Sequence, residues 1–193
     1  MDTNKKSDTI KNKNEIDRIK KYLKDKNDFV NDRHLLYFIL GINTCIRPKD
    51  LLTLKWDNLI DMDKNIVYDY IIYNGYHFSL NNTCKKYLYY YVKKYKEKIN
   101  FEYVFSVNGK PFSIQTINYK WNEIERSLNL DFNFTAQSLH RTFIYWQIKE
   151  YNYDYVKIEK LRRLIYKSKQ DSLYIYSGYD INDDLYYIND VNL

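Results

Sequence analysis

Residues 36–56 read LYFILGINTCIRPKDLLTLKW, and this stretch decides the fold that the sequence predicts. Its first part, LYFILGI, is too continuously apolar for a surface element, so it predicts an interior helix. Pro48 suits the first turn of a second helix, where its missing N–H leaves no hydrogen bond unmade. The leucines that follow give this second helix a buried face, and Trp56 closes it. Arg47 stands at the junction between the two helices.

Arg47 is therefore the first candidate for a functional residue. Packing on both sides can hold its stem, while its guanidinium group can point into a cleft. A guanidinium is planar, always charged and able to grip a phosphate with two parallel hydrogen bonds. The alternative is an ordinary surface arginine before a helix, and the spacing alone does not separate these two interpretations.

Composition narrows the class of protein. The chain has 193 residues, a formal net charge of +6 and a pI near 9.0, which is a modest case for a polyanionic partner. It contains 23 tyrosines, so the position of any one tyrosine is weak evidence that this residue is functional. Cys45 and Cys84 lack a metal-ligand spacing and are expected to be free buried thiols of a reducing, cytoplasmic compartment. No stretch predicts a membrane span or a signal peptide.

Periodicity predicts a mostly helical α+β domain with a small sheet. A three-stranded antiparallel sheet is expected from WDNLI, residues 66–73 and residues 76–80, with the last two joined at an Asn-Gly turn. A short strand is expected at 103–105, and Ser113 should cap the helix that follows. Apolar periodicity predicts one helix that begins at residue 14 and another that begins at residue 114. It predicts further helices at 29–42, 82–100, 136–150, 154–166 and 171–177.

Three segments are expected along the chain. Residues 1–13 are polar and lysine-rich, as in a flexible basic arm. Residues 14–178 form the single domain. Residues 179–193 form an acidic tail, with several aspartates and no lysine or arginine. This tail is either a frayed end or a segment that docks on a basic patch of the same or a neighbouring subunit.

The stretch GINTCIRPKDLLTLKWDNL at 41–59 resembles the first catalytic box of the tyrosine recombinases, the phage integrase family. Arg47, Asp50, Leu51, Leu54 and Trp56 fall in register with that box. Residues 101–124, FEYVFSVNGKPFSIQTINYKWNEI, look like the middle segment of the family, with a strand, a glycine turn and a helix. The resemblance implies the tyrosine-recombinase catalytic-domain fold over residues ~10–178. Only an arm precedes the first helix, so the separate DNA-clamping domain of many members is not expected.

The resemblance also implies a chemistry. Such enzymes attack a DNA phosphodiester with a tyrosine, and the resulting phosphotyrosine conserves the bond energy, so no cofactor and no metal are expected. Positioned cations neutralise the charge of the phosphoryl transition state. The family supplies two arginines, a general-acid lysine on the sheet hairpin, and histidines or a tryptophan. Arg47 matches the first arginine, but Tyr73-Asn74-Gly75 stands where the hairpin lysine belongs.

The second box, H-x-L-R-H-T-F in the family, reads QSLHRTF at 137–143. Gln137 takes the place of the first histidine, His140 that of the arginine and Arg141 that of the next histidine. The exchange turns the guanidinium by about 100° around the helix, which aims it elsewhere unless its long stem compensates. Arg141 is then a plain contact to a DNA phosphate, or a catalytic arginine if the register shifts by one residue.

The last box is matched by IYKSKQDSLYIYSGY at 165–179. Lys167 falls on the family histidine, where it keeps a donor and adds charge. Tyr176 is the candidate nucleophile, with Tyr174 and Tyr179 as competitors. The candidate catalytic set is thus Arg47, His140, Arg141, Lys167 and Tyr176. The lysines expected to contact DNA lie in or near the boxes: Lys49, Lys55, Lys110 and Lys120.

The leading hypothesis is a DNA-binding relative of the recombinases, from a mobile element, with lost or weak strand cleavage and a regulatory or accessory role. Its expected partners are duplex DNA and further copies of itself, which would place it on the nucleoid when bound. One alternative is an active minimal recombinase for integration or inversion that uses Tyr176. Another is a protein-interaction module in which the basic charge is incidental.

Overall fold

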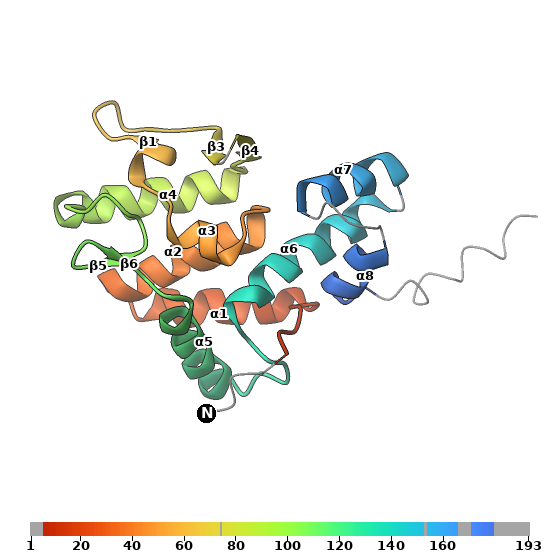
Figure 1. Cartoon of the computed structure of the whole chain (residues 1–193). Coiled ribbons are helices and arrows are strands. Elements are labelled where there is room, and N and C mark those ends of the chain that lie inside the picture. Colours follow the sequence, from red (N-terminus) through yellow and green to blue (C-terminus); the bar gives the residue numbers. More distant parts are fainter. Residues whose placement is uncertain (1–5, 74, 153, 166–170, 180–193) are drawn as a thin grey trace, which may run out of the picture.

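The computed structural model describes residues 6–73, 75–152, 154–165 and 171–179. It is mostly helical with short antiparallel hairpins, which confirms the expected fold class (Figure 1). Lys167 and the acidic tail beyond residue 179 lie outside the described residues.

The interior helix predicted from the opening stretch is α2, Phe29–Asn43. The Asp28 side chain caps it by accepting hydrogen bonds from the N–H groups of Val30 and Asn31. Every residue from 32 to 41 is buried, because α2 contacts α1 (Lys13–Asp25), α4 (Asn82–Tyr95) and α6 (Ala136–Tyr151). Figure 1 shows α2 at the centre of this group of helices.

The second predicted helix is α3, Pro48–Leu52, and Pro48 occupies its first turn as expected. Arg47 is the residue before it and is extended, with φ −64° and ψ 148°, which is the conformation that a following proline favours. Leu51 and Leu52 are buried. A short 3-10 turn, η1 (Trp56–Asn58), then leads to the hairpins.

The sheet differs from the expectation of three joined strands. In the part of the chain that the structure describes, β1 (Ile60–Asp61) pairs with β2 (Ile66–Val67), and β3 (Tyr70–Tyr73) pairs separately with β4 (Tyr76–Ser79). Between the two hairpins, the backbone hydrogen bonds pass from one neighbouring segment to another. The Tyr68 N–H donates back to the Leu59 carbonyl at 3.0 Å, whereas the Asp69 carbonyl accepts from the Leu80 N–H at 2.8 Å.

Residues 103–105, predicted as one strand, also make backbone hydrogen bonds to two different segments. The Phe105 carbonyl accepts from the Phe112 N–H at 2.8 Å. Val104 N–H donates to the Leu54 carbonyl at 2.9 Å, and the next hairpin is β5 (Ser106–Val107) with β6 (Lys110–Pro111). The remaining helices agree closely with the predicted ranges. They are η2 (Lys96–Lys98), α5 (Ile114–Leu128), α7 (Tyr155–Ile165) and α8 (Asp171–Ser177). Ser113 caps α5 through the Thr116 N–H, as predicted.

Two apolar cores hold the fold together. The larger core surrounds α2 and contains the buried indole of Trp121, which stacks on Phe134 with ring centroids 4.9 Å apart. The smaller core joins α6 to α7 and α8 through Cys45 and six aliphatic residues: Ile144, Ile148, Ile158, Leu161, Ile165 and Leu173. Helix α6 contributes to both cores and therefore connects α7 and α8 to the rest of the molecule.

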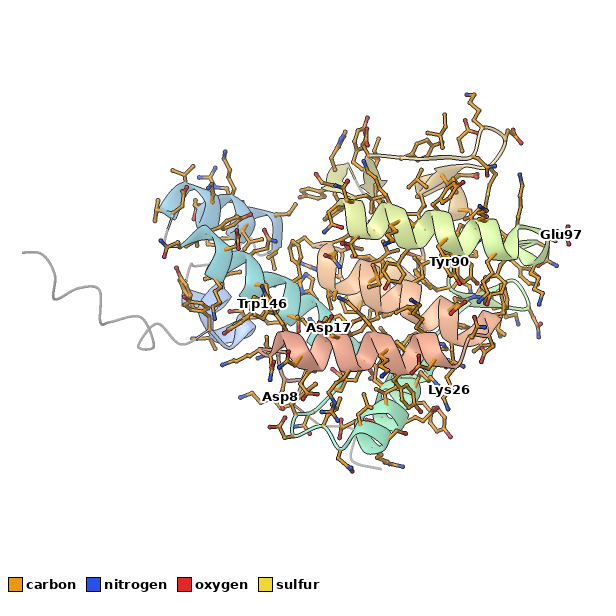
Figure 2. All side chains as sticks on the ribbon, turned by 180° about the vertical axis from the view of Figure 1, so that it is seen from behind. Asp8, Asp17, Lys26, Tyr90, Glu97 and Trp146 are labelled. Carbon is orange, nitrogen blue, oxygen red and sulfur yellow. The ribbon has the colours of Figure 1, made fainter. Side chains whose placement is uncertain are left out.

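Residues 7–12, which the composition assigns to a flexible arm, pack against the domain. Ile10 is fully buried, its N–H donates to Thr142 Oγ1 at 2.9 Å, and its carbonyl accepts from Trp146 Nε1 at 3.1 Å. Trp146 lies on α6 beside the start of α1, with Lys13 Nζ 5.0 Å from its ring (Figure 2). One buried isoleucine and two side-chain partners thus order a segment of polar composition.

Cys45 and Cys84 are free and buried, as predicted. Burial raises the pKa of both thiols to about 12. Among the described residues, no helix is long and apolar enough to cross a membrane.

Helices α2 and α6 pack closely at Gly41. A Cβ atom added at Gly41 would lie 2.7 Å from Leu139 Cδ1 and 3.0 Å from Leu139 Cβ. In an open helix Gly→Ala stabilises by up to ~1 kcal/mol. Here overpacking reverses the sign, and we expect Gly41→Ala to lower the free energy of unfolding by ~1–3 kcal/mol in urea denaturation.

The double variant Gly41→Ala/Leu139→Ala provides the control, because Leu139→Ala removes Cδ1, the nearest atom, and leaves only Cβ at 3.0 Å. The loss caused by Gly41→Ala should shrink or vanish in the Leu139→Ala background. Additive losses would show that the two helices do not meet at this point.

Candidate functional site

A cleft of about 530 Å³ lies where α3, α5, α6, α7 and α8 meet. Arg47 reaches it from the turn before α3, His140 from α6 and Tyr176 from α8. The other described residues that line it are mainly polar or small: Ser7, Pro48, Lys49, Asp50, Ile114, Asn118, Thr135, Ala136, Gln137 and Ile165. Three of the five candidate catalytic residues are therefore brought together from distant parts of the sequence.

Arg47 is held by backbone rather than by a carboxylate. Its Nη2 donates to the carbonyl of Ile165, the last residue of α7, at 3.0 Å. The residue as a whole remains exposed, and its guanidinium lies in the cleft. The hydrogen bond to Ile165 fixes the orientation of the Arg47 guanidinium. The remaining N–H groups of this guanidinium are free to donate to an anion in the cleft.

His140 and Tyr176 form the central contact of the site. The distance between His140 Nδ1 and Tyr176 Oη is 3.0 Å, and the two rings meet edge to face. Burial lowers the pKa of His140 to about 4; the Cys45 backbone opposes this shift, and the positive charge of Arg47 adds to it. The imidazole is therefore neutral at pH 7. It can accept a hydrogen bond from the phenol but brings no charge to the cleft.

Arg141 does not line this cleft. It lines a second hollow of about 540 Å³, together with Lys6 and Lys11. Its guanidinium carbon lies 5.2 Å from the centre of the Tyr176 ring. The exchange of arginine and histidine in QSLHRTF thus has the geometric consequence expected from the helical repeat: His140 faces the cleft, and Arg141 is aimed elsewhere.

The hairpin residue Tyr73 lies at the edge of a smaller hollow of about 250 Å³, which shares Arg47 and Asp50 with the main cleft. Its hydroxyl lies 2.9 Å from Thr53 Oγ1 and 3.5 Å from Asp50 Oδ1. Arg163 of α7 also lines this hollow, although its Nε donates to Glu159 at 2.9 Å. No motif in the sequence pointed to Arg163, because its proximity depends on how α7 packs.

The four lysines expected to contact DNA are placed differently. Lys49 lines the cleft. Lys55 pairs with Glu102 at 2.6 Å, and Lys110 is exposed on β6. These two lie outside the lining of the cleft.

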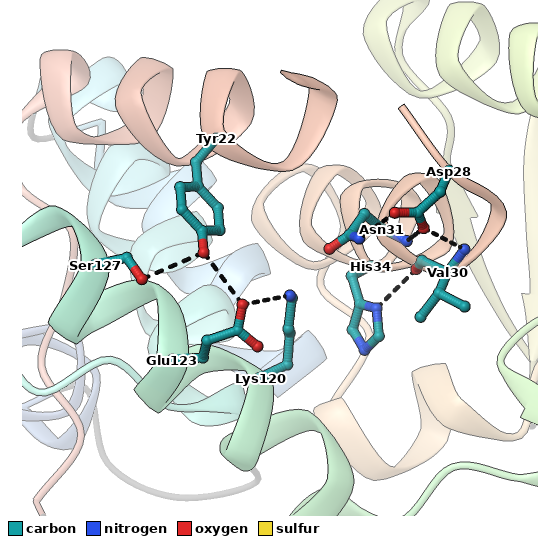
Figure 3. A network of polar contacts seen from close by, with 8 residues as sticks. All are labelled: Tyr22, Asp28, Val30, Asn31, His34, Lys120, Glu123 and Ser127. Carbon is teal, nitrogen blue, oxygen red and sulfur yellow. Dashed lines mark hydrogen bonds and ion pairs between the residues drawn. The ribbon is translucent and has the colours of Figure 1, made fainter. Parts of the chain in front are cut away.

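Lys120 is the clearest departure from the expected set. It pairs with Glu123 at 2.8 Å, and its side chain is only 14% exposed. Glu123 also accepts a hydrogen bond from the Tyr22 hydroxyl, so the lysine belongs to a contact between α5 and α1 (Figure 3). The Lys120 ammonium is therefore neutralised by Glu123 and does not line the cleft.

The polar lining also includes residues that the sequence did not suggest. Asn118 Oδ1 accepts the first N–H of α6, that of Ala136, at 2.8 Å, and this bond fixes the helix end beside the cleft. Thr135 precedes α6 and caps it together with Ser138. Within the described ranges, no three His, Cys, Asp or Glu side chains gather as a metal ion would require.

The sequence profile described as "Phage integrase family" matches residues 11–161, most of the chain. The chain belongs to this family. The match ends before α8, so the family relationship does not by itself identify Tyr176. Comparison of the sequence with curated proteins found no significant match.

Solved structures of family recombinases share the fold. The crystal structure of XerA recombinase aligns with a TM-score of 0.71 at 15% identity, covering 99% of this chain and 68% of that one. The Tn1549 transposon integrase in complex with transposon right end DNA aligns at 0.66 and 12% identity, covering 97% and 67%. XerH recombinase bound to difH substrate, a post-cleavage complex, aligns at 0.65 and 15% identity, covering 96% and 54%.

The chain therefore spans about two thirds of the XerA and Tn1549 structures and about half of the XerH structure. At these identities the likeness establishes the fold of the domain. It carries no information about which side chains act in this chain, and that question rests on the geometry of the cleft.

The buried histidines predict how stability depends on pH. Burial lowers the pKa of both His140 and His34 to about 4, from an ordinary value near 6.5. Between pH 6.5 and 4 the unfolded chain takes up protons that the native state refuses, so the free energy of unfolding falls as the pH falls. The loss should reach ~3 kcal/mol per histidine by pH 4 and be absent above pH 7.

Urea denaturation at pH 7.5, 6.0 and 5.0 measures this slope, and His140→Gln should remove about half of the histidine contribution. A proton NMR titration assigns the effect directly to the ring of His140. A midpoint for His140 near 6.5 would contradict the buried, neutral imidazole.

Proposed function

We propose that this chain is a duplex-DNA-binding member of the phage integrase family, from a mobile element, with lost or weak strand cleavage and a regulatory or accessory role. The observation that carries the proposal is the composition of the cleft. Arg47 and Tyr176 lie in it together, while the position of the second family arginine holds the neutral His140.

Several features support DNA as the partner. The chain carries a net charge of +6, and Arg47 presents its guanidinium in an open cleft with Lys49 beside it. Arginine is the side chain best suited to a phosphate oxygen pair. The Tn1549 integrase and XerH, which share the fold, were both solved in complex with DNA.

The argument for weak cleavage is electrostatic. Phosphoryl transfer gathers negative charge on the equatorial oxygens, which positioned cations and proton donors must stabilise. Among the described residues that line the cleft, the cations are Arg47 and Lys49, and Asp50 adds a negative charge. Each missing donor typically lowers the rate by ~10²–10³, and the hairpin lysine and the second arginine are both replaced here.

An active minimal recombinase is the second candidate, and one contact favours it. The Tyr176 hydroxyl lies 3.0 Å from His140 Nδ1, in the same cleft as Arg47, which is a suitable position for a nucleophile. Lys167, which falls on the family histidine in the sequence alignment, would then have to supply the additional charge.

DNA binding through phosphates predicts a strong dependence on salt. The affinity for duplex DNA should fall linearly in a log–log plot, with a slope near −0.9 per phosphate neutralised. Arg47→Ala should weaken binding about tenfold and make the slope shallower by about one unit. Fluorescence anisotropy between 50 and 300 mM salt measures both quantities.

Arg126→Ala is the matched control, because it removes an exposed arginine near the far end of α5. It should leave the slope close to that of the unmodified protein. Equal effects of the two substitutions, or affinity that does not change with salt, would remove the cleft from the DNA-binding surface.

Strand cleavage is tested with a nicked suicide substrate that traps a phosphotyrosyl intermediate. We expect no covalent adduct, or accumulation at least ~10³ times slower than in an active family recombinase assayed in parallel, because two charged groups are missing. Tyr176→Phe serves as the comparison. An adduct that forms rapidly in the unmodified protein and disappears in Tyr176→Phe would establish the active-recombinase alternative.

A further inference from the structure

Residues 7–11, here called the latch segment, connect the start of the chain to the helix that carries Tyr176. One side of the segment is fixed to α6 by the two hydrogen bonds of Ile10, to Thr142 and Trp146. At its beginning, Asp8 exchanges hydrogen bonds with the backbone of Asn133, at 3.1 Å and 2.9 Å. The segment therefore has its own anchors and does not depend on α8 for its position.

The other side of the latch segment holds the end of α8. The Thr9 hydroxyl donates to the carbonyl of Ser177 at 2.5 Å, and both residues are buried. This carbonyl lies one residue after Tyr176, in the last turn of α8, where the helix itself offers no donor. Lys11 and Arg141 flank the same point, since a Cβ at Gly178 would lie within 4 Å of Thr9 Oγ1, Arg141 Nη2 and Lys11 Cε.

Helix α8 needs such a contact because it is short. It has seven residues, far fewer than an isolated helix requires for stability in water. Leu173 is its buried apolar anchor, whereas Ile175 is 78% exposed. Tyr174 and Tyr176 pack, partly buried, against the same core as Leu173, and the Thr9 hydrogen bond adds a contact at the C-terminal end of the helix, next to Tyr176.

We propose that Thr9 is a positioning residue that latches α8 in cis and so holds Tyr176 in the cleft. Tyr176 is then fixed at three points. His140 meets its hydroxyl, Arg141 covers one face of its ring, and Thr9 holds the carbonyl of the following residue. The meaning of this placement for catalysis rests on the proposed function, whereas the latch itself is a property of the free protein.

Thr9→Val tests the latch, because valine keeps the shape of threonine and removes the hydroxyl. Loss of one buried hydrogen bond should raise the opening of α8 about tenfold. Two measurements follow it in the full-length protein without DNA. They are amide hydrogen exchange over residues 173–179, and the rate at which tetranitromethane nitrates Tyr176, mapped by mass spectrometry.

Thr9→Ser retains the hydroxyl and should restore both rates to those of the unmodified protein. Thr83→Val, an exposed threonine at the start of α4, is the matched control and should change neither rate. Nitration of Tyr119, which is 73% exposed on α5, should be the same in all variants, and so should exchange of the core amides of α2.

If Thr9→Val is too unstable to study, Trp146→Phe removes the anchor of the latch segment at Ile10 from a distance and should raise the same two rates. Unchanged exchange in α8 and unchanged nitration of Tyr176 in folded Thr9→Val would overturn the proposal. An equal increase across α2 and α8 would also overturn it, because it would show general destabilisation. Neither readout uses DNA, so loss of the proposed function in binding assays leaves this test intact.

Discussion

The close packing of α2 against α6 is the constraint on which the candidate site depends. Gly41 allows the backbone of α2 to approach Leu139, and a side chain added there would have to displace Leu139 or one of the helices. Arg47 lies four residues after the last residue of α2, Asn43, and His140 is the residue next to Leu139. A contact deep in the core therefore sets the separation of two groups that line the cleft. Change at this contact would propagate to the cleft because packed interiors transmit displacement.

The charge of the cleft depends on which side chains of α3 and α6 line it. Burial keeps the His140 imidazole neutral, and the nearby Arg47 charge acts in the same direction. Of these two residues, Arg47 therefore carries a positive charge in the cleft and His140 does not. Under the proposed function, an anion in the cleft would be held mainly by Arg47, while His140 contacts the Tyr176 hydroxyl. The proposal of weak strand cleavage follows from this arrangement, since cleavage of a phosphodiester requires charge at several oxygens at once.

The smaller core explains why the Tyr176 helix depends on contacts beyond its own sequence. Helices α7 and α8 join the molecule through α6 and through a few aliphatic side chains. The Ile165 carbonyl at the end of α7 holds Arg47, and the hydroxyl of Thr9 holds the end of α8. Two backbone carbonyls at helix ends, where intrahelical partners are missing, therefore connect the site to the scaffold.

Local patterns in the chain were enough to predict the helices, the interior position of α2, the proline start of α3, the cap at Ser113 and the family box around Arg47. These features are encoded by periodicity and by residues whose backbone preferences act over a few positions. It also predicted that exchanging His140 and Arg141 would separate them around the helix, because the helical repeat is a local property.

Which of these two residues faces the cleft depends on tertiary packing, since the contact of Leu139 with Gly41 sets the rotation of α6. The sequence named Tyr176 as the candidate nucleophile with Tyr174 and Tyr179 as competitors, whereas its contact with His140, which joins two distant helices, is visible only in the folded chain. The polar residues 7–12 read as a flexible arm because composition reports average solvation. Their order comes from Ile10, whose partners on α6 lie more than 130 positions away. Contacts between segments so far apart leave no periodic signal in the chain, so only the folded arrangement reveals them.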